Sequence, residues 1–207
     1  MLVRPLTVFA ACLILLAASA VPMSTDLPPK MFVEAQSIRL ADSGQPRTTG
    51  GIIALYPRAV DAQKLAVPGG EPPEYLHLTL VDFGDDVSGR ADNELRRVLD
   101  HLTAAHPHPI EAQVFGRATL NLNGEEPDTA TVYLVGDSPE LVPLRQQVLK
   151  ASEQLFPLPA QHEPWVSHIT AGYLPSDSVL TDTGPVVFDR IGLSWAGQTS
   201  YFALGGR

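Results

Sequence analysis

The apolar residues of this chain fall into helical spacings and short runs that alternate along the sequence. Between positions 91 and 105, leucine and valine recur every three or four residues, which predicts an amphipathic helix. The same spacing predicts a second helix over 139–156, and a short helix is expected over 58–67. Apolar runs bounded by Gly, Pro, Asn or Ser predict strands over 51–56, 75–82, 110–122, 129–135, 165–173, 186–194 and 199–204.

The order of these predicted elements repeats along the chain. A strand, a helix and a histidine-containing strand occur in the first half, and the same order returns in the second half before the last strands. Strands and helices mixed in this way favour an α+β fold, with helices covering one side of antiparallel sheets. The repeated order also indicates an internal duplication that residue identity no longer reveals.

Two of the predicted strands carry the same pattern, His–apolar–Thr–apolar. It occupies residues 77–80 and returns at residues 168–171, 91 positions later (168 − 77). Side chains two positions apart in a strand point to the same face of the sheet. Each segment therefore places an imidazole beside a hydroxyl, in the pairs His77 with Thr79 and His168 with Thr170.

Paired histidines and threonines suit chemistry on a phosphate ester. Cleaving a phosphodiester requires one proton to be removed and another to be delivered, and two imidazoles can divide these tasks near neutral pH. A threonine hydroxyl beside each ring can donate a hydrogen bond to a phosphate oxygen. One such histidine alone would more often be a half-buried strand residue, but two in matched contexts favour one composite site. No metal or cofactor is required.

At this separation, the two segments resemble the motifs of the two-histidine (2H) phosphoesterase superfamily. That superfamily includes the bacterial 2′-5′ RNA ligase (LigT-like) proteins and cyclic phosphodiesterases, and the resemblance extends over about residues 48–205. It implies a bilobal, duplicated α+β fold in which two antiparallel β-sheets flank a central cleft and helices lie outside. It also implies that His77 and His168 are the catalytic acid and base, and that Thr79 and Thr170 bind phosphate.

The implied substrates are small nucleotide phosphodiesters: 2′,3′-cyclic phosphates, other cyclic nucleotides or 2′-5′ linkages. Tyr75 precedes His77 by two positions, so in a continuous strand it shares that face and is a candidate pocket residue. Trp165 precedes the second motif and is a candidate for stacking on a base. The alternative for both aromatic residues is that they fill the core.

The charge balance limits the partners that we expect. The chain has 14 Lys and Arg against 23 Asp and Glu, a net charge of −9. Long nucleic acids are held by many Lys and Arg contacts, so the expected partner is a small nucleotide or an RNA end, bound by a monomer. Two rival hypotheses remain: a non-catalytic module of the same fold that binds or sequesters a nucleotide, and a pair of structural, buried histidines.

The amino terminus has the layout of a secretory signal peptide. Arg4 precedes an apolar run over 6–17, and a small-residue cleavage site follows, so residues 1–20 are a candidate leader. This run is shorter than the roughly 20 apolar residues of a membrane span. The alternative is that Met23 is the true start. We expect a secreted or periplasmic protein if the leader is genuine, and otherwise a cytoplasmic one.

The leader hypothesis completes the expected organisation. Residues 21–47 are expected to form an arm, and residues 48–207 a single bilobal domain. The chain has one cysteine, Cys12, which lies within the candidate leader. The processed chain would then contain no disulfide and no thiolate metal site. Histidines after the helix at 91–105 are interpreted as surface residues, so no metal site is predicted.

Overall fold

The computed structural model describes residues 48–120, 129–173 and 180–205, which all lie in one compact unit, Gln36–Arg207. The candidate leader over 1–20 and the arm over 21–47 lie outside the described residues. Within the described part of the chain, no helix has the length and apolar character needed to cross a membrane.

The described residues form an α+β fold, as predicted. In chain order the elements are β1 (Gly51–Pro57), α1 (Ala59–Leu65), the short 3₁₀ helix η1 (Pro73–Tyr75), β2 (Leu78–Asp82), α2 (Asn93–Ala104), β3 (Ile110–Leu120), β4 (Ala130–Gly136), α3 (Leu141–Glu153), β5 (His168–Gly172), β6 (Gly184–Trp195) and β7 (Gln198–Ala203).

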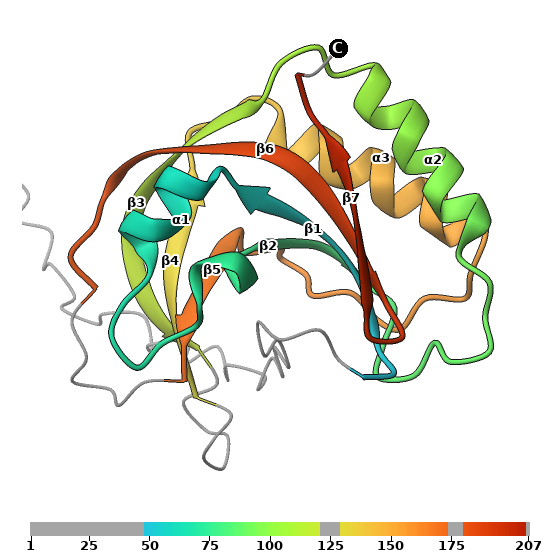
Figure 1. Ribbon diagram of the computed structural model, residues 1–207, viewed down its shortest axis with the longest axis horizontal. Helices are drawn as coiled ribbons and strands as arrows, with labels where there is room; N and C mark the ends of the chain where they lie inside the picture. Colours follow the sequence, from blue (N-terminus) through green and yellow to red (C-terminus); the bar gives the residue numbers. More distant parts are fainter. Residues whose placement is uncertain (1–47, 121–128, 174–179, 206–207) are drawn as a thin grey trace, which may run out of the picture. The chain divides into compact units, whose positions relative to one another are not determined.

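The strands make one antiparallel sheet in the order β2-β1-β6-β3-β4-β5, with β7 paired to β6 (Figure 1). The two sheets expected from the sequence are the two ends of this single sheet. They are continuous because β6 is 12 residues long and pairs with β3 along its first part and with β1 along its second.

A β-bulge in β6 keeps one face of this long strand apolar. The register of β6 against β1 shifts by one residue, so Asp189 is left opposite no residue of β1. Before the shift Val186 and Phe188 point into the core, and after it Ile191 and Leu193 do. An extra residue inverts the alternation of side chains, and here the inversion matches the change of neighbouring strand.

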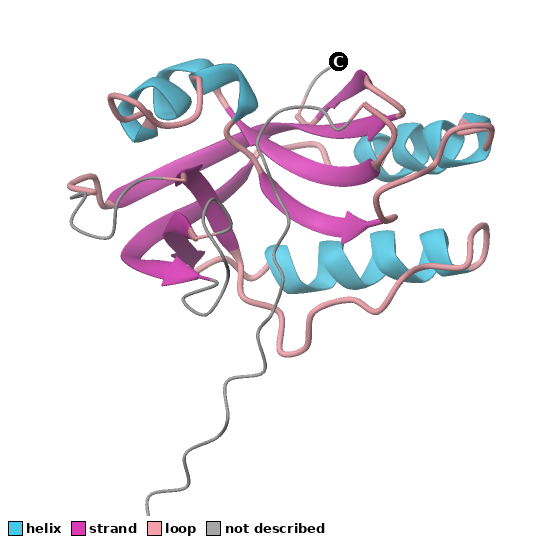
Figure 2. Cartoon of the chain, turned by 90° about the horizontal axis from the view of Figure 1, so that it is seen from below, coloured by secondary structure: helices cyan, strands magenta, loops and turns pink. Residues whose placement is uncertain are grey.

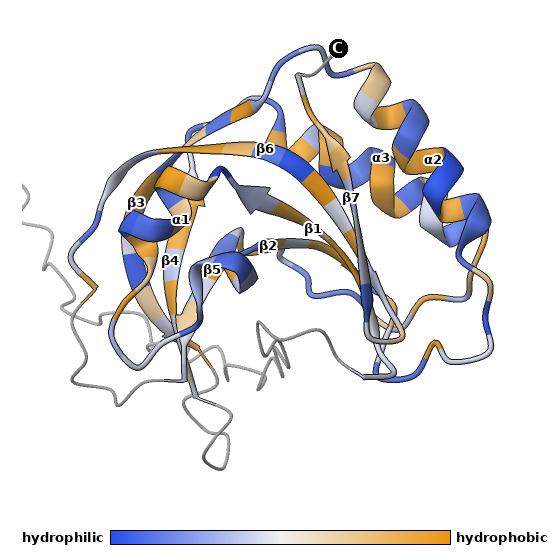
Figure 3. Cartoon of the chain, viewed as in Figure 1, coloured by the Kyte–Doolittle hydropathy of each residue, from blue (hydrophilic) through white to orange (hydrophobic). Residues whose placement is uncertain are grey.

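Helices α2 and α3 lie next to each other against the core (Figures 1 and 2). Their helical spacing buries Leu95 and Leu99 from α2 and Leu141, Leu144 and Val148 from α3. These side chains pack with the inward-facing residues of the strands, and the outer surfaces of both helices carry polar residues (Figure 3). The opposite face of the sheet carries Thr79 of β2 and Thr170 of β5, together with a smaller buried group on β1, namely Ile52, Ala54 and Tyr56.

The two edge strands of the main sheet are β2 and β5, the strands that follow or begin with the histidines. The sheet curls so that these edges come side by side (Figure 1). Two segments about 90 residues apart in sequence are thus adjacent in space.

Candidate active site

The two His–Thr pairs point away from the apolar core. Thr79 lies opposite Ala54 of β1, and Thr170 lies opposite Val132 of β4. The intervening residues Leu78 and Ile169 are completely buried in the core. The alternation predicted from sequence is therefore present around both motifs.

Each histidine is held by the same backbone contact. The Nδ1 atom of His77 lies 2.6 Å from the carbonyl oxygen of Tyr75, and Nδ1 of His168 lies 2.7 Å from that of Val166. A carbonyl oxygen only accepts hydrogen bonds, so Nδ1 must carry the proton in both rings. In the neutral imidazole the lone pair then resides on Nε2, which fixes one tautomer and one orientation at both positions.

Both imidazoles are well enclosed. His77 has 4% of its surface exposed and His168 has 7%. Packing on this scale leaves the rings little freedom to rotate, and the contact to the carbonyl two residues earlier sets their direction. Catalytic and structural histidines can both be enclosed to this degree. A catalytic ring responds to added phosphate, whereas a structural ring does not.

The segment before β5 joins the two halves by running along the outer edge of β2. Trp165 donates from its indole Nε1 to the carbonyl oxygen of Thr79 at 3.3 Å. Gln161 accepts from the backbone nitrogen of Asp82 at 3.1 Å and donates to its carbonyl oxygen at 2.8 Å. These bonds replace the strand pairing that an edge strand otherwise lacks.

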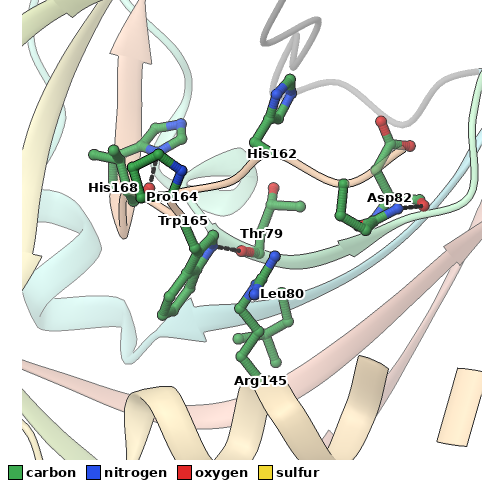
Figure 4. Close-up of a pocket in the computed structure, with 10 residues that line it drawn as sticks. Thr79, Leu80, Asp82, Arg145, His162, Pro164, Trp165 and His168 are labelled. Atoms are coloured by element: carbon green, nitrogen blue, oxygen red, sulfur yellow. Dashed lines mark hydrogen bonds between the residues drawn. The ribbon is translucent and has the colours of Figure 1, made fainter. Parts of the chain in front are cut away.

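A pocket opens where the two halves meet (Figure 4). Its lining comes from β2, from α3 and from the segment before β5, namely Thr79, Leu80, Asp82, Arg145, Gln161, His162, Pro164, Trp165, Val166 and His168. Three predicted site residues, Thr79, Trp165 and His168, thus line one pocket. His77 and Thr170 lie on the same face of the sheet but outside this lining.

Tyr75 is placed differently from its prediction. The strand expected over 75–82 begins only at Leu78, and Tyr75 belongs to the 3₁₀ helix η1. The expectation that Tyr75 shares a strand face with His77 is therefore wrong. The reason is local, because Pro73 opens this helical turn with the backbone angle that proline imposes. Tyr75 contributes its carbonyl oxygen, which holds His77.

Arg145 was not predicted as a site residue. It extends from α3, is 7% exposed, and its Nη1 donates to Glu163 at 3.1 Å. Its guanidinium lies 5.1 Å from the ring centroid of Trp165, a cation–π distance. The sequence does contain a signal, because Arg145 is a lone charge at the spacing of Leu141 and Val148 on the buried side of the helix.

A second unpredicted group lies beside His77. The ring centroids of Tyr56 and His77 are 5.6 Å apart, and those of Tyr56 and Tyr201 are 5.1 Å apart. The guanidinium of Arg190 lies 5.7 Å from the Tyr56 ring and 5.2 Å from the Tyr201 ring. We call Tyr56, Arg190 and Tyr201 the aromatic–arginine cluster.

Among the described residues, no group of three or more His, Cys, Asp or Glu side chains is arranged to hold a metal ion. The chemistry that the described side chains offer at this site is acid–base transfer by imidazole and hydrogen bonding by hydroxyl, guanidinium and indole groups.

Comparison with known proteins defines the fold. No protein-family model and no curated protein matches the chain. Solved structures do match: the Thermus thermophilus protein TT0787 has a TM-score of 0.50 and 18% identity, over 76% of this chain and 99% of that one. E. coli LigT complexed with 3′-AMP also has a TM-score of 0.50 and 18% identity, over 75% and 95%. The chain therefore has the α+β fold of LigT, the fold that the resemblance to the 2H phosphoesterases implied.

Proposed function

We propose that this protein is a metal-independent phosphoesterase that cleaves a small nucleotide phosphodiester by two-histidine acid–base catalysis. The observation that carries the proposal is the matched pair of imidazoles at adjacent sheet edges. Both rings are locked in the same tautomer by the carbonyl oxygen two residues earlier. Two structural histidines would need neither the same tautomer nor a threonine at the same offset.

The reaction follows from these groups. The Nε2 atom of one neutral imidazole takes a proton from water as the water oxygen bonds to phosphorus. The bond from phosphorus to one ribose oxygen breaks, and the other histidine, in its protonated form, delivers a proton to that leaving oxygen. One water is consumed and the cyclic diester becomes a monoester. Thr79 and Thr170 donate hydrogen bonds to the non-bridging oxygens as negative charge grows there.

The substrate is expected to be small. A net charge of −9 disfavours a long phosphate backbone, which proteins hold by many Lys and Arg contacts. LigT, whose fold this chain shares, was crystallised with the mononucleotide 3′-AMP. These two facts favour a mononucleotide or an RNA end, and among these we propose a 2′,3′-cyclic phosphate as the first candidate, ahead of 3′,5′-cyclic and 2′-5′ linked nucleotides.

The test is a substrate screen in the presence of EDTA. We expect product from at least one of the 2′,3′-cyclic, 3′,5′-cyclic and 2′-5′ linked nucleotides, followed by chromatography and mass spectrometry. Unchanged activity with EDTA supports metal independence, and loss of activity with EDTA contradicts it. Tight binding by calorimetry with no product from any substrate would replace the enzyme with a nucleotide-sequestering module.

A further inference from the structure

The aromatic–arginine cluster is assembled by the pairing of three strands. Tyr56 of β1 lies directly opposite Arg190 of β6, and Tyr201 of β7 lies opposite Gly192 of β6. A Cβ atom at Gly192 would lie 2.3 Å from the Tyr56 ring, so glycine leaves the space that this ring occupies. Ala54 pairs with both Gly192 and Thr79, which puts the cluster on the face that carries the His77 motif.

The corresponding positions in the other half of the sheet are different in kind. On β1, Tyr56 lies two positions after Ala54, which pairs with Thr79. On β4, Leu134 lies two positions after Val132, which pairs with Thr170. Leu134 is opposite His168, and its partner on β3 is Gly116. The partner of Tyr56 on β6 is Arg190. The catalytic pairs match, whereas the strand-paired positions beside them differ: an aromatic and a cationic residue beside His77, a leucine and a glycine beside His168.

The cluster presents a surface suited to a planar ring. Tyr201 is 51% exposed, whereas Tyr56 beneath it is 5% exposed. Arg190 lies against both rings and donates to Asp189 at 2.8 Å, which holds the guanidinium in place. Tyrosine rings and guanidinium planes are the groups on which proteins stack unpaired bases.

We infer that the aromatic–arginine cluster binds the nucleobase of the substrate, so that the nucleoside lies on the His77 side of the phosphate. Tyr201 and Arg190 supply the stacking surfaces, and Tyr56 is a positioning residue whose ring contacts both of them and His77. The inference rests on the proposed function for its ligand class. It adds what that proposal leaves open, namely which end of the symmetric acid–base pair the nucleoside occupies.

The test measures binding separately from catalysis. Calorimetry compares adenosine 3′-phosphate, one of the two ring-opened products of a 2′,3′-cyclic nucleotide, with the base-free ribose 3-phosphate. Removing a stacking ring weakens base binding by about 5- to 150-fold, the equivalent of the usual 1–3 kcal/mol. We expect that loss for Tyr201→Ala with adenosine 3′-phosphate, and no change with ribose 3-phosphate.

Two control variants separate stacking from general damage. Tyr201→Phe keeps the ring and is expected to bind adenosine 3′-phosphate within about 2-fold of the original protein, well inside the range of a lost ring. Phe115→Ala removes another exposed aromatic side chain, from the other half of the sheet, and is expected to leave both affinities unchanged.

The outcomes are distinct. The inference is overturned if Tyr201→Ala weakens both ligands equally or weakens neither, or if the original protein does not bind adenosine 3′-phosphate. It is supported if the loss depends on the base. Base-dependent binding without hydrolysis of any cyclic nucleotide would uphold the inference and refute the proposed phosphoesterase activity.

Discussion

The two histidine-bearing ends of the sheet are alike at the imidazole and unlike around it. On both sides Nδ1 donates to the carbonyl oxygen two residues earlier, at 2.6 and 2.7 Å. The carbonyl belongs to the 3₁₀ helix η1 on the His77 side, and to the irregular segment before β5 on the His168 side. The neighbours on the adjacent strand also differ, Tyr56 beside His77 and Leu134 beside His168.

The difference indicates which features the chemistry requires. The same contact arises from two unrelated local structures, so it is not a by-product of one type of turn. The shared parts are those that an acid–base reaction on one phosphate needs, namely tautomer, orientation and a hydroxyl at a fixed offset. Under the proposed function, the unshared parts are those that would hold a substrate with two unlike ends in one direction.

The largest expected effect comes from removing either imidazole. If both ends act in one reaction, His77→Ala and His168→Ala each lower kcat by about 10²- to 10⁴-fold, the usual contribution of a general acid or base. The double variant should be little worse than the worse single variant, because the two groups act as a unit. Steady-state kinetics on the cyclic nucleotide that the screen identifies gives these values.

The control for this pair is His108→Ala, which removes an exposed imidazole outside the site and should leave kcat unchanged. A loss confined to one of the two histidines would break the symmetry of the comparison. NMR adds a check on structural roles: both rings should show the Nδ1–H tautomer and respond to added phosphate. Rings that ignore phosphate would indicate that the histidines serve only the fold.

Removing the hydroxyls should have the next largest effect. Thr79→Val and Thr170→Val keep the β-branched shape and delete a hydrogen bond to a charged group, worth about 1.5–3 kcal/mol. We therefore expect kcat/KM to fall by about 10- to 150-fold in each variant. Equal losses would show that the two threonines, like the two histidines, have equivalent roles. A loss below about 2-fold for either threonine, far under that range, would remove it from the phosphate site.

Sequence patterns predict the parts of this site that are local. The shared face of each His and Thr pair follows from strand alternation, and the buried sides of α2 and α3 follow from helical spacing. Both depend only on neighbouring residues, and both were predicted correctly. The start of β2 was not, because the turn at Pro73 competes with the strand preference of Tyr75 and Leu76. The aromatic–arginine cluster could not be predicted, since no pattern within one strand indicates that β1, β6 and β7 are neighbours.

The continuity of the two predicted sheets also could not be predicted from local patterns. Residues 186–194 were predicted as a strand, and the structure extends it to Gly184–Trp195. Its role as the shared strand depends on the bulge at Asp189, where the apolar residues change from even to odd positions. A bulge is visible in the sequence only as a break in alternation, which is also what a strand end looks like.

A smaller effect is expected where the two ends touch. Trp165→Phe keeps an aromatic ring over Arg145 and removes the N–H that binds the Thr79 carbonyl. One such bond contributes about 0.5–1.5 kcal/mol. We expect the free energy of unfolding to fall by about 1 kcal/mol and kcat/KM to fall a few-fold, because Thr79 is less well held.

Trp195→Phe is the matched control for this contact. Its indole donates to the carbonyl oxygen of Arg90 at 2.9 Å, and it does not line the pocket. The control should lose similar stability in urea unfolding while keeping its kcat/KM. If both tryptophan variants lose activity in proportion to stability, the Trp165 contact serves folding and does not position Thr79.

The smallest effect tests a difference in the core. Tyr133 lies opposite Ile169 on the His168 side, where the His77 side has Leu55 opposite Leu78. The Tyr133 hydroxyl is buried and has no hydrogen-bond partner among the described residues. Tyr133→Phe makes the two ends more alike and removes this unsatisfied group, so we expect a gain of about 1 kcal/mol in stability.

The pH dependence of that gain provides its own control. Burial, and then the negative charge of Asp182, raise the pKa of Tyr133 from 10.0 to about 12. Below pH 10 the phenol is neutral in both the folded and unfolded chain. Between pH 10 and 12 the unfolded chain releases this proton while the folded one retains it, so the protein with Tyr133 loses stability. The advantage of Tyr133→Phe in urea unfolding should therefore grow from about pH 9 to about pH 11. An advantage that shrinks would show that the folded state lowers the pKa of this hydroxyl, which contradicts its burial without a partner.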